Sequence, residues 1–303
     1  MQVIETSTTM DERQPTLSTD QIAYYCEHGY LVVEDVVDKD RLDELRKVTA
    51  DFIENSRTIN QSNKVFDIGH GHCADSPVVR RIKNPADQHS AYDKLMRSDA
   101  IVSIVADLIG PDVRFDHSKL NFKPPGGGAA IEWHQDWAFY PHTNQDILAV
   151  GVLLEDCNLE NGPLMVLPGS HKGPVYNHHH NGVFVGAIDL DSKSIDVSDA
   201  VALTGKSGSI TIHHVRTVHG SQENFSNTTR PLLLLSYAAV DAWPMVEKPD
   251  WDEFNSRILT GEATWAPRQE VVPIRIPLPG MPNSDSIFDD QQDVRGRSFA
   301  HKV

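Results

Sequence analysis

Two side chains of metal-binding type stand two residues apart in the segment Glu132-Trp-His-Gln-Asp-Trp137. On a β-strand, alternate residues point to the same face, so His134 and Asp136 would project together while Gln135 points away. Two histidines and one carboxylate hold Fe(II) in non-haem oxygenases and leave positions open for a co-substrate and dioxygen. An isolated His-x-Asp also arises by chance, so this prediction depends on a second histidine elsewhere in the chain.

The second histidine lies in a segment typical of a β-hairpin. His219 is followed by a polar turn over 224–229, and Pro231 begins an apolar strand, where proline is tolerated at the first residue. The returning strand brings Arg230 beside the strand that carries His219. Arginine suits a bidentate grip on a carboxylate, so Arg230 could anchor the far carboxylate of 2-oxoglutarate while the keto-acid end chelates iron. Without the two metal segments, Arg230 would be interpreted as a surface charge.

Other histidines are weaker candidates. Three consecutive histidines at 178–180 precede the turn residues Asn181-Gly182. Consecutive residues of a strand cannot all face one ion, so we expect an exposed loop there. His213 is expected beside the metal site or in the core. His171 ends a Pro-Gly-Ser-His turn, where a structural hydrogen bond is the better explanation.

The N-terminal third of the chain favours helices. A capping box begins the first of them, and apolar residues at helical spacing mark the second. Residues 56–86 are mixed and polar, and receive no assignment. The predicted elements are a helix from Ser18 to about Gly29, a strand over 30–33, an amphipathic helix from Asp38 or Asp40, and a helical region over 87–109.

After Pro111, short runs of β-branched and aromatic residues alternate with turn residues. Many short strands at this spacing indicate a sandwich or closed barrel, with the N-terminal helices covering one sheet. We expect a flexible tail over 1–16 and one α+β domain over 17–303, an all-β core with flanking helices. Residues 242–268 could form a helical insert or lid, and 280–303 a partly loose end. The predicted strands cover 113–123, 147–154, 164–167, 183–188, 209–213, 232–240 and 271–276.

The formal net charge is −16, from 43 acidic and 27 basic residues. A chain with this much negative charge repels phosphate backbones and anionic membranes. We therefore expect neither nucleic acid nor a membrane as a partner. Three scattered cysteines form no disulfide framework, and we see no signal peptide or membrane-length apolar segment. We expect a cytoplasmic protein with a small-molecule substrate.

Four segments together resemble the phytanoyl-CoA dioxygenase family, which also contains ectoine hydroxylase. The resemblance runs from about residue 18 to 243, and its third and fourth segments are the most specific. The four are Tyr24-Tyr-Cys-Glu-His-Gly-Tyr-Leu-Val-Val33, His134-Gln-Asp136, Asn161-Gly-Pro-Leu-Met-Val-Leu-Pro-Gly-Ser-His171, and His219-Gly-Ser221 followed by Arg230.

The resemblance implies a double-stranded β-helix, the jelly-roll core of cupin-like proteins. It also implies Fe(II) as the cofactor and 2-oxoglutarate and dioxygen as co-substrates. The implied reaction hydroxylates an unactivated C–H bond of a metabolite and releases succinate and carbon dioxide. The resemblance assigns catalysis and iron binding to His134, Asp136 and His219. It assigns the C5 carboxylate of 2-oxoglutarate to Arg230 and Ser221, and the keto-acid end to Asn121.

Several alternatives stay open. Related halogenases replace the iron carboxylate with a small residue, so Asp136 favours hydroxylation over halogenation, but desaturation, epimerisation and ring closure use the same chemistry. A zinc-dependent hydrolase or a non-catalytic cupin-like binding protein is a more distant reading. The substrate could be a small polar metabolite, an amino-acid derivative, a secondary-metabolite scaffold or an acyl thioester.

Overall fold

The computed structural model describes residues 14–126, 130–192, 195–246, 249–274, 286–291 and 299. Most of the tail predicted over residues 1–16 therefore lies outside the described residues. The prediction that residues 17–303 form one domain stays a prediction. Within the described residues, no helix is both long enough and apolar enough to cross a membrane.

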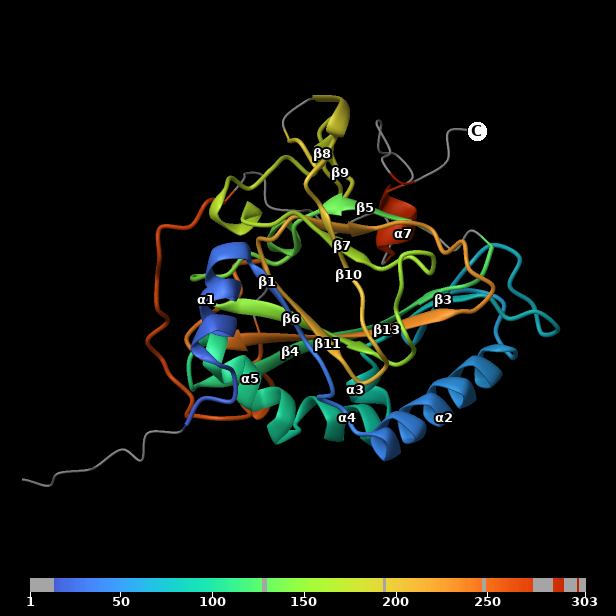
Figure 1. The fold of residues 1–303 in the computed structure, drawn as a ribbon, viewed down its shortest axis with the longest axis horizontal. Coiled ribbons are helices and arrows are strands. Elements are labelled where there is room, and N and C mark those ends of the chain that lie inside the picture. The colour runs from blue at the N-terminus through green and yellow to red at the C-terminus, as the bar shows by residue number, and fades with distance from the viewer. Residues whose placement is uncertain are drawn as a thin grey trace, which may run out of the picture.

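Two antiparallel sheets form the core of the molecule (Figure 1). The larger sheet has seven strands and the smaller has four, which gives the double-stranded β-helix that the resemblance implies. In spatial order, the large sheet is β1 (Tyr30–Val33), β11 (Ile210–His214), β6 (Ile147–Leu153), β13 (Arg230–Ala239), β4 (Val113–Lys123), β3 (Val79–Lys83) and β2 (Phe66–Ile68); the small sheet is β10 (Val201–Leu203), β7 (Leu164–Val166), β12 (His219–Ser221) and β5 (Ile131–His134).

Helices cover the outer face of the large sheet, as predicted, and Figure 1 shows α2 to α5 on the side opposite β5 and β7. The α5 helix packs on β4, β6 and β13. Its apolar side chains Ile101, Ile104 and Val105 join Leu120 and Leu233 of the sheet in the largest buried cluster. The helices of this layer are α1 (Thr19–His28), α2 (Lys39–Ser56), α3 (Pro85–Gln88), α4 (Ser90–Met96) and α5 (Asp99–Ile109).

The helical region predicted over 87–109 is three helices. His89 is extended at φ −150° and separates α3 from α4, and Ser98 is extended at φ −66° and ψ 137° before α5. An extended residue cannot continue the helical hydrogen bonds, so the chain changes direction at each. The unassigned segment 56–86 supplies β3, which pairs with β4, and β2, which forms the edge of the large sheet.

The strand predicted over 271–276 is wrong for residues 271–274, and residues 275 and 276 lie outside the described residues. Val272 and Ile274 pack against a buried apolar cluster without a partner strand. The carbonyl of Pro273 accepts a hydrogen bond from the Trp137 indole at 2.8 Å, and proline has no N–H for a ladder. The segment 242–268 contains one short helix, α6 (Trp251–Ser256).

Two of the sequence segments that carried the resemblance meet around Gly29. Gly29 ends α1 at φ 77°, and its carbonyl accepts a hydrogen bond from Thr217 Oγ1 at 2.8 Å. His171 contacts the Cys26 carbonyl at 3.2 Å, which is the structural role predicted for it. A Cβ at Gly29 would lie 2.6 Å from Thr217 Oγ1 and against the His171 ring. This contact joins α1 to the strand end that precedes His219.

Replacing Gly29 with alanine should therefore cost more stability than its backbone conformation alone explains. We expect a loss of about 2–4 kcal/mol, from left-handed strain plus overpacking. Gly71 is a matched control, because its φ is 80° and nothing lies within 4 Å of an added Cβ. Gly71→Ala should cost only about 1–2 kcal/mol. Urea unfolding of both variants measures the difference, and equal losses would contradict the close contact.

Candidate active site

Three candidate metal ligands converge where the two strands β5 and β12 pair. His134 and His219 are direct cross-strand partners. Asp136 follows on a 3-10 turn, Asp136–Ala138, so the carboxylate belongs to a turn after the strand rather than to the strand itself. Its Oδ1 lies 4.0 Å from His134 Nε2 and 3.9 Å from His219 Nε2. Ligands that bind one ion at about 2.0–2.2 Å can be at most about 4.4 Å apart, so both distances fit one metal.

Hydrogen bonds orient both imidazole rings toward that point. His134 Nδ1 lies 2.8 Å from the Glu132 carbonyl, and His219 Nδ1 lies 2.9 Å from the Thr217 carbonyl. A carbonyl can only accept, so each Nδ1 carries the proton and each Nε2 offers a lone pair. Burial lowers the pKa of His134 to about 4 and that of His219 well below its usual value, which keeps both rings neutral.

The second oxygen of Asp136 faces His213. His213 Nε2 lies 3.7 Å from Asp136 Oδ2, and both ring nitrogens lack a hydrogen-bond partner among the described residues. Burial opposes ionisation of Asp136, but the facing His213 imidazole and the charge of Lys119 hold its pKa well below the usual range. Burial together with the charge of Asp136 raises the pKa of Tyr140. The position of His213 beside the carboxylate suits it to orient Asp136.

Replacing His213 with leucine should weaken metal binding without removing a ligand. We expect the affinity for Fe(II) to fall about 10–100-fold, the usual effect of losing a group that orients a ligand. Titration of the apoprotein with Fe(II) under argon measures this. Thr211→Val is the matched control, because Thr211 is a buried residue of the same strand that hydrogen-bonds the Gly151 carbonyl. If both variants bind Fe(II) like the original protein, His213 does not position Asp136.

A cavity of about 280 Å³ opens over the three ligands. All three residues assigned to 2-oxoglutarate by the resemblance, Arg230, Ser221 and Asn121, line it. Arg230 is 3% exposed and donates a hydrogen bond to the Gly162 carbonyl, and burial lowers its pKa. Its Nε has no partner among the described residues, so the guanidinium can still bind an anion.

The side-chain amide of Asn121 has its oxygen bound to the protein and its nitrogen available to the cavity. Arg81, its cross-strand partner on β3, donates from Nε to Asn121 Oδ1 at 2.7 Å. The amide nitrogen of Asn121 then remains able to donate to a carboxylate. Arg81 and Lys119 were not predicted as site residues, although Lys119, Asn121 and Lys123 alternate along one strand face.

The C-terminal segment closes one side of this cavity. Ile287 and Phe288 of α7 (Ile287–Asp290) line it, and the Arg81 guanidinium lies 5.4 Å from the Phe288 ring centroid. Arg80 holds α7 in place through Asp289 at 2.8 Å and binds Asp67 of β2 at 2.6 Å. Within the segment 280–303, predicted to be partly loose, residues 286–291 are therefore held against the cavity.

The three histidines at 178–180 are not an exposed loop. His178 is 1% exposed, and its Nε2 accepts a hydrogen bond from the main-chain N–H of Gln135 at 2.9 Å. Gln135 points away from the ligands, as predicted, and its side chain donates to the Arg216 carbonyl at 2.8 Å. These contacts fix the main chain between the two ligands His134 and Asp136.

A family model described as phytanoyl-CoA dioxygenase (PhyH) matches residues 25–232. The chain belongs to the phytanoyl-CoA dioxygenase family. It is 35% identical over 279 residues to a protein of Stutzerimonas stutzeri named as a probable alpha-ketoglutarate-dependent hypophosphite dioxygenase, which covers 91% of this chain and 97% of the relative. It is 28% identical to an ectoine dioxygenase of Sphingopyxis alaskensis, over 77% of this chain and 79% of the relative.

Solved structures agree with the fold of this phytanoyl-CoA dioxygenase family member. A crystal structure of EctD from S. alaskensis with bound Fe superimposes with a TM-score of 0.66 at 26% identity, covering 86% of this chain and 90% of that one. EctD has also been crystallised with 2-oxoglutarate and 5-hydroxyectoine. The family and the double-stranded β-helix predicted from the sequence are both confirmed.

The family segment over 161–171 packs behind the arginine of the cavity. Gly162 has a φ of 72°, and a Cβ there would lie 2.7 Å from Lys123 Cδ and 2.7 Å from the Gln222 carbonyl oxygen. Lys123, the cross-strand partner of Arg230, donates to the same Gln222 carbonyl at 2.6 Å. Glycine at 162 thus lets two buried cations and their carbonyl partners lie side by side.

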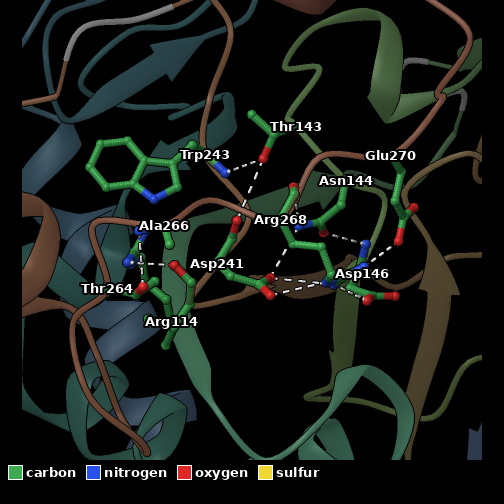
Figure 2. A network of polar contacts seen from close by, with 11 residues as sticks. Arg114, Thr143, Asn144, Asp146, Asp241, Trp243, Thr264, Ala266, Arg268 and Glu270 are labelled. Atoms are coloured by element: carbon green, nitrogen blue, oxygen red, sulfur yellow. Dashed lines mark hydrogen bonds and ion pairs between the residues drawn. The ribbon is translucent and has the colours of Figure 1, made fainter.

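A second cavity of about 630 Å³ adjoins the first and shares Arg81, Lys119 and Phe139 with it. Its wall includes His142 and Pro244, which form an isolated antiparallel bridge. Figure 2 shows how the two loops of this wall are tied together: Arg268 lies among Asp146, Asp241 and Glu270, and Thr143 accepts a hydrogen bond from the Trp243 amide at 3.1 Å. These contacts stabilise the wall of the second cavity, called the outer cavity below. It adjoins the inner cavity, which contains the metal site.

Proposed function

We propose that this protein is an Fe(II)- and 2-oxoglutarate-dependent dioxygenase that hydroxylates a small molecule. The observation that carries the proposal is the buried His134, Asp136 and His219 constellation beside Arg230, a buried guanidinium with an unsatisfied Nε in the same cavity. The crystal structures of EctD with Fe and with 2-oxoglutarate support the same pair of cofactors. We place the protein in the cytoplasm, where its free thiols would stay reduced.

In this proposal each residue has one physical task. His134 and His219 offer neutral Nε2 atoms, and Asp136 offers an ionised oxygen, to one Fe(II). Iron, when bound, supplies the oxidative activation of dioxygen, driven by decarboxylation of 2-oxoglutarate to succinate. The remaining predicted residues orient the co-substrate: Arg230 and Ser221 bind its C5 carboxylate, and Asn121 donates to its keto-acid end.

Other outcomes of the same chemistry stay possible. Structures named as a carbocyclase and an epimerase from nogalamycin biosynthesis share the fold at 21% and 18% identity. A hydrolase on the same barrel has no use for Arg230, and a non-catalytic protein has no use for the three ligands. The complete set therefore favours an oxygenase over both.

The first test needs no knowledge of the substrate. Purified protein with Fe(II), ascorbate and 2-oxoglutarate under air should form succinate slowly, and His134→Ala should abolish this turnover. Binding of 2-oxoglutarate that depends on Fe(II) should be seen even if uncoupled turnover is too slow to detect. Absence of both would overturn the proposal.

A further inference from the structure

Lys119 lies where the two cavities meet, and the proposed function gives it no role. It belongs to β4, on the face that also presents Asn121 and Lys123, and it lines both cavities. Asn121 and Lys123 lie toward Arg230, the cross-strand partner of Lys123, whereas Lys119 lies two positions further along the strand opposite Leu234. The strand therefore carries one cation beyond the proposed 2-oxoglutarate contacts.

The Lys119 ammonium lacks an anionic partner of its own. Within the part of the chain that the structure describes, no hydrogen bond or ion pair reaches it, and its closest recorded contact is the Tyr140 ring, 5.7 Å from the ring centroid. Burial lowers its pKa, against the attraction of Asp136. Asp136 is committed to the metal, and the Asp116 carboxylate hydrogen-bonds His117 Nδ1 at 2.6 Å. Lys119 is only partly buried and lines both cavities, so a bound anion could supply the charged partner that its ammonium lacks.

The charges that line the inner cavity leave room for such an anion. Its basic residues are Arg81, Lys119, Lys123 and Arg230, and its only acidic residue among those described is Asp136. In the proposed arrangement, one carboxylate of 2-oxoglutarate lies at the Arg230 end and the other at the Asn121 end. Because Fe(II) adds further positive charge, the cavity stays net positive at Lys119 after the co-substrate is bound.

We propose that Lys119 binds an oxyanion group of the substrate, so that the substrate is a compact anion such as a phosphinate, phosphonate, sulfonate or carboxylate. This inference rests on the proposed function. The inner cavity of about 280 Å³ must hold 2-oxoglutarate as well, so the part of the substrate that lies beside the metal has to be compact. The relative named as a hypophosphite dioxygenase points to the same class, since hypophosphite is a small oxyanion.

The reaction balances with the co-substrates already named. One oxygen atom of dioxygen enters a C–H or P–H bond of the substrate and gives C–OH or P–OH. The other oxygen atom enters succinate, and 2-oxoglutarate loses carbon dioxide. Two electrons come from the substrate bond and two from the co-substrate. Lys119 takes no part in these steps; it holds the oxyanion so that the oxidisable bond faces the metal.

The test compares anions and a neutral analogue on the intact protein loaded with Fe(II) and 2-oxoglutarate. The probes are hypophosphite, methylphosphonate, methanesulfonate, propionate and the uncharged dimethyl methylphosphonate. We expect at least one anion to stimulate succinate formation at least tenfold, and the neutral ester to give none. The four anions separate the possible oxyanion classes from one another, and the oxidised product is identified by mass spectrometry.

Two lysine variants then locate the binding group. Lys119→Met should raise the KM for the active anion about 100-fold, the usual cost of removing one partner of a buried charge pair, while the affinity for 2-oxoglutarate changes far less. Lys119→Arg should restore part of the affinity for the anion. Lys83→Met is the matched control, because Lys83 lines only the outer cavity.

Two results would overturn the inference while leaving the proposed function intact. One is Fe(II)-dependent turnover that no anion stimulates. The other is a KM for the anion that Lys119→Met and Lys83→Met leave equally unchanged. Failure of 2-oxoglutarate to bind at all would instead overturn the proposed function, so the two failures are distinguishable.

Discussion

His219→Ala should leave a folded protein that no longer retains Fe(II). The two remaining ligands, His134 and Asp136, lie two residues apart in one segment and cannot enclose the ion from the opposite strand. Loss of groups that merely orient a ligand costs about 10–100-fold in metal affinity, so loss of the ligand itself should cost more than 100-fold. Iron content after anaerobic loading and desalting measures this directly, and succinate formation should vanish in parallel.

His70→Ala serves as the control for His219→Ala, because His70 is an exposed histidine outside the cavity. It should retain a full equivalent of iron. Retention of iron by His219→Ala at the level of this control would mean that the metal site is elsewhere.

Arg230→Leu should raise the dissociation constant for 2-oxoglutarate while leaving iron bound. Arg230 is buried and lies opposite Lys123 rather than beside the metal ligands. Truncating one partner of a buried charge pair costs about 2–5 kcal/mol, which corresponds to an increase of roughly 30-fold to several thousand-fold. Titration of the Fe(II) protein with 2-oxoglutarate under argon, followed by its metal-to-ligand absorbance, gives the constant without any turnover.

Arg97→Leu is the control for this titration, because Arg97 is an exposed arginine paired with Asp93 at the surface. It should leave the dissociation constant unchanged. If Arg230→Leu behaves the same way, the C5 carboxylate is held by the neighbouring Lys123, and Lys123→Met should then show the larger effect.

The sequence predicted the elements whose residue pattern is strong. The strand predicted over 113–123 agrees with β4, and the first two helices begin where Ser18 and Asp38 cap them. The spacing of His134 and Asp136 and the hairpin around Arg230 predicted residues that the structure brings to one cavity. Local periodicity and turn chemistry were sufficient for these features because each depends on residues close together in the chain.

The parts that escaped prediction depend on contacts between distant segments. The strands β2 and β3 have only three and five residues, too few to show an alternation that distinguishes them from a loop. Arg81 enters the site only because β3 pairs with β4, and α7 closes the cavity only because Asp289 meets Arg80, a residue 209 positions earlier. His178 was predicted to lie in an exposed loop because the residues next to it in the sequence do not indicate its partner. That partner is the main-chain N–H of Gln135, 43 positions earlier.

The alternation along β4 sets a scale for the molecules that the site can accept. Same-face neighbours on a strand are about 7 Å apart, so Lys119, Asn121 and Lys123 mark equal intervals along one line. In the proposed arrangement a dicarboxylate must span from the metal to Arg230 at one end of that line. A keto diacid one methylene shorter would fall short of the arginine, and a longer one would press on the buried cations. In the proposed arrangement, the spacing of side chains along β4 would therefore select the co-substrate by its length.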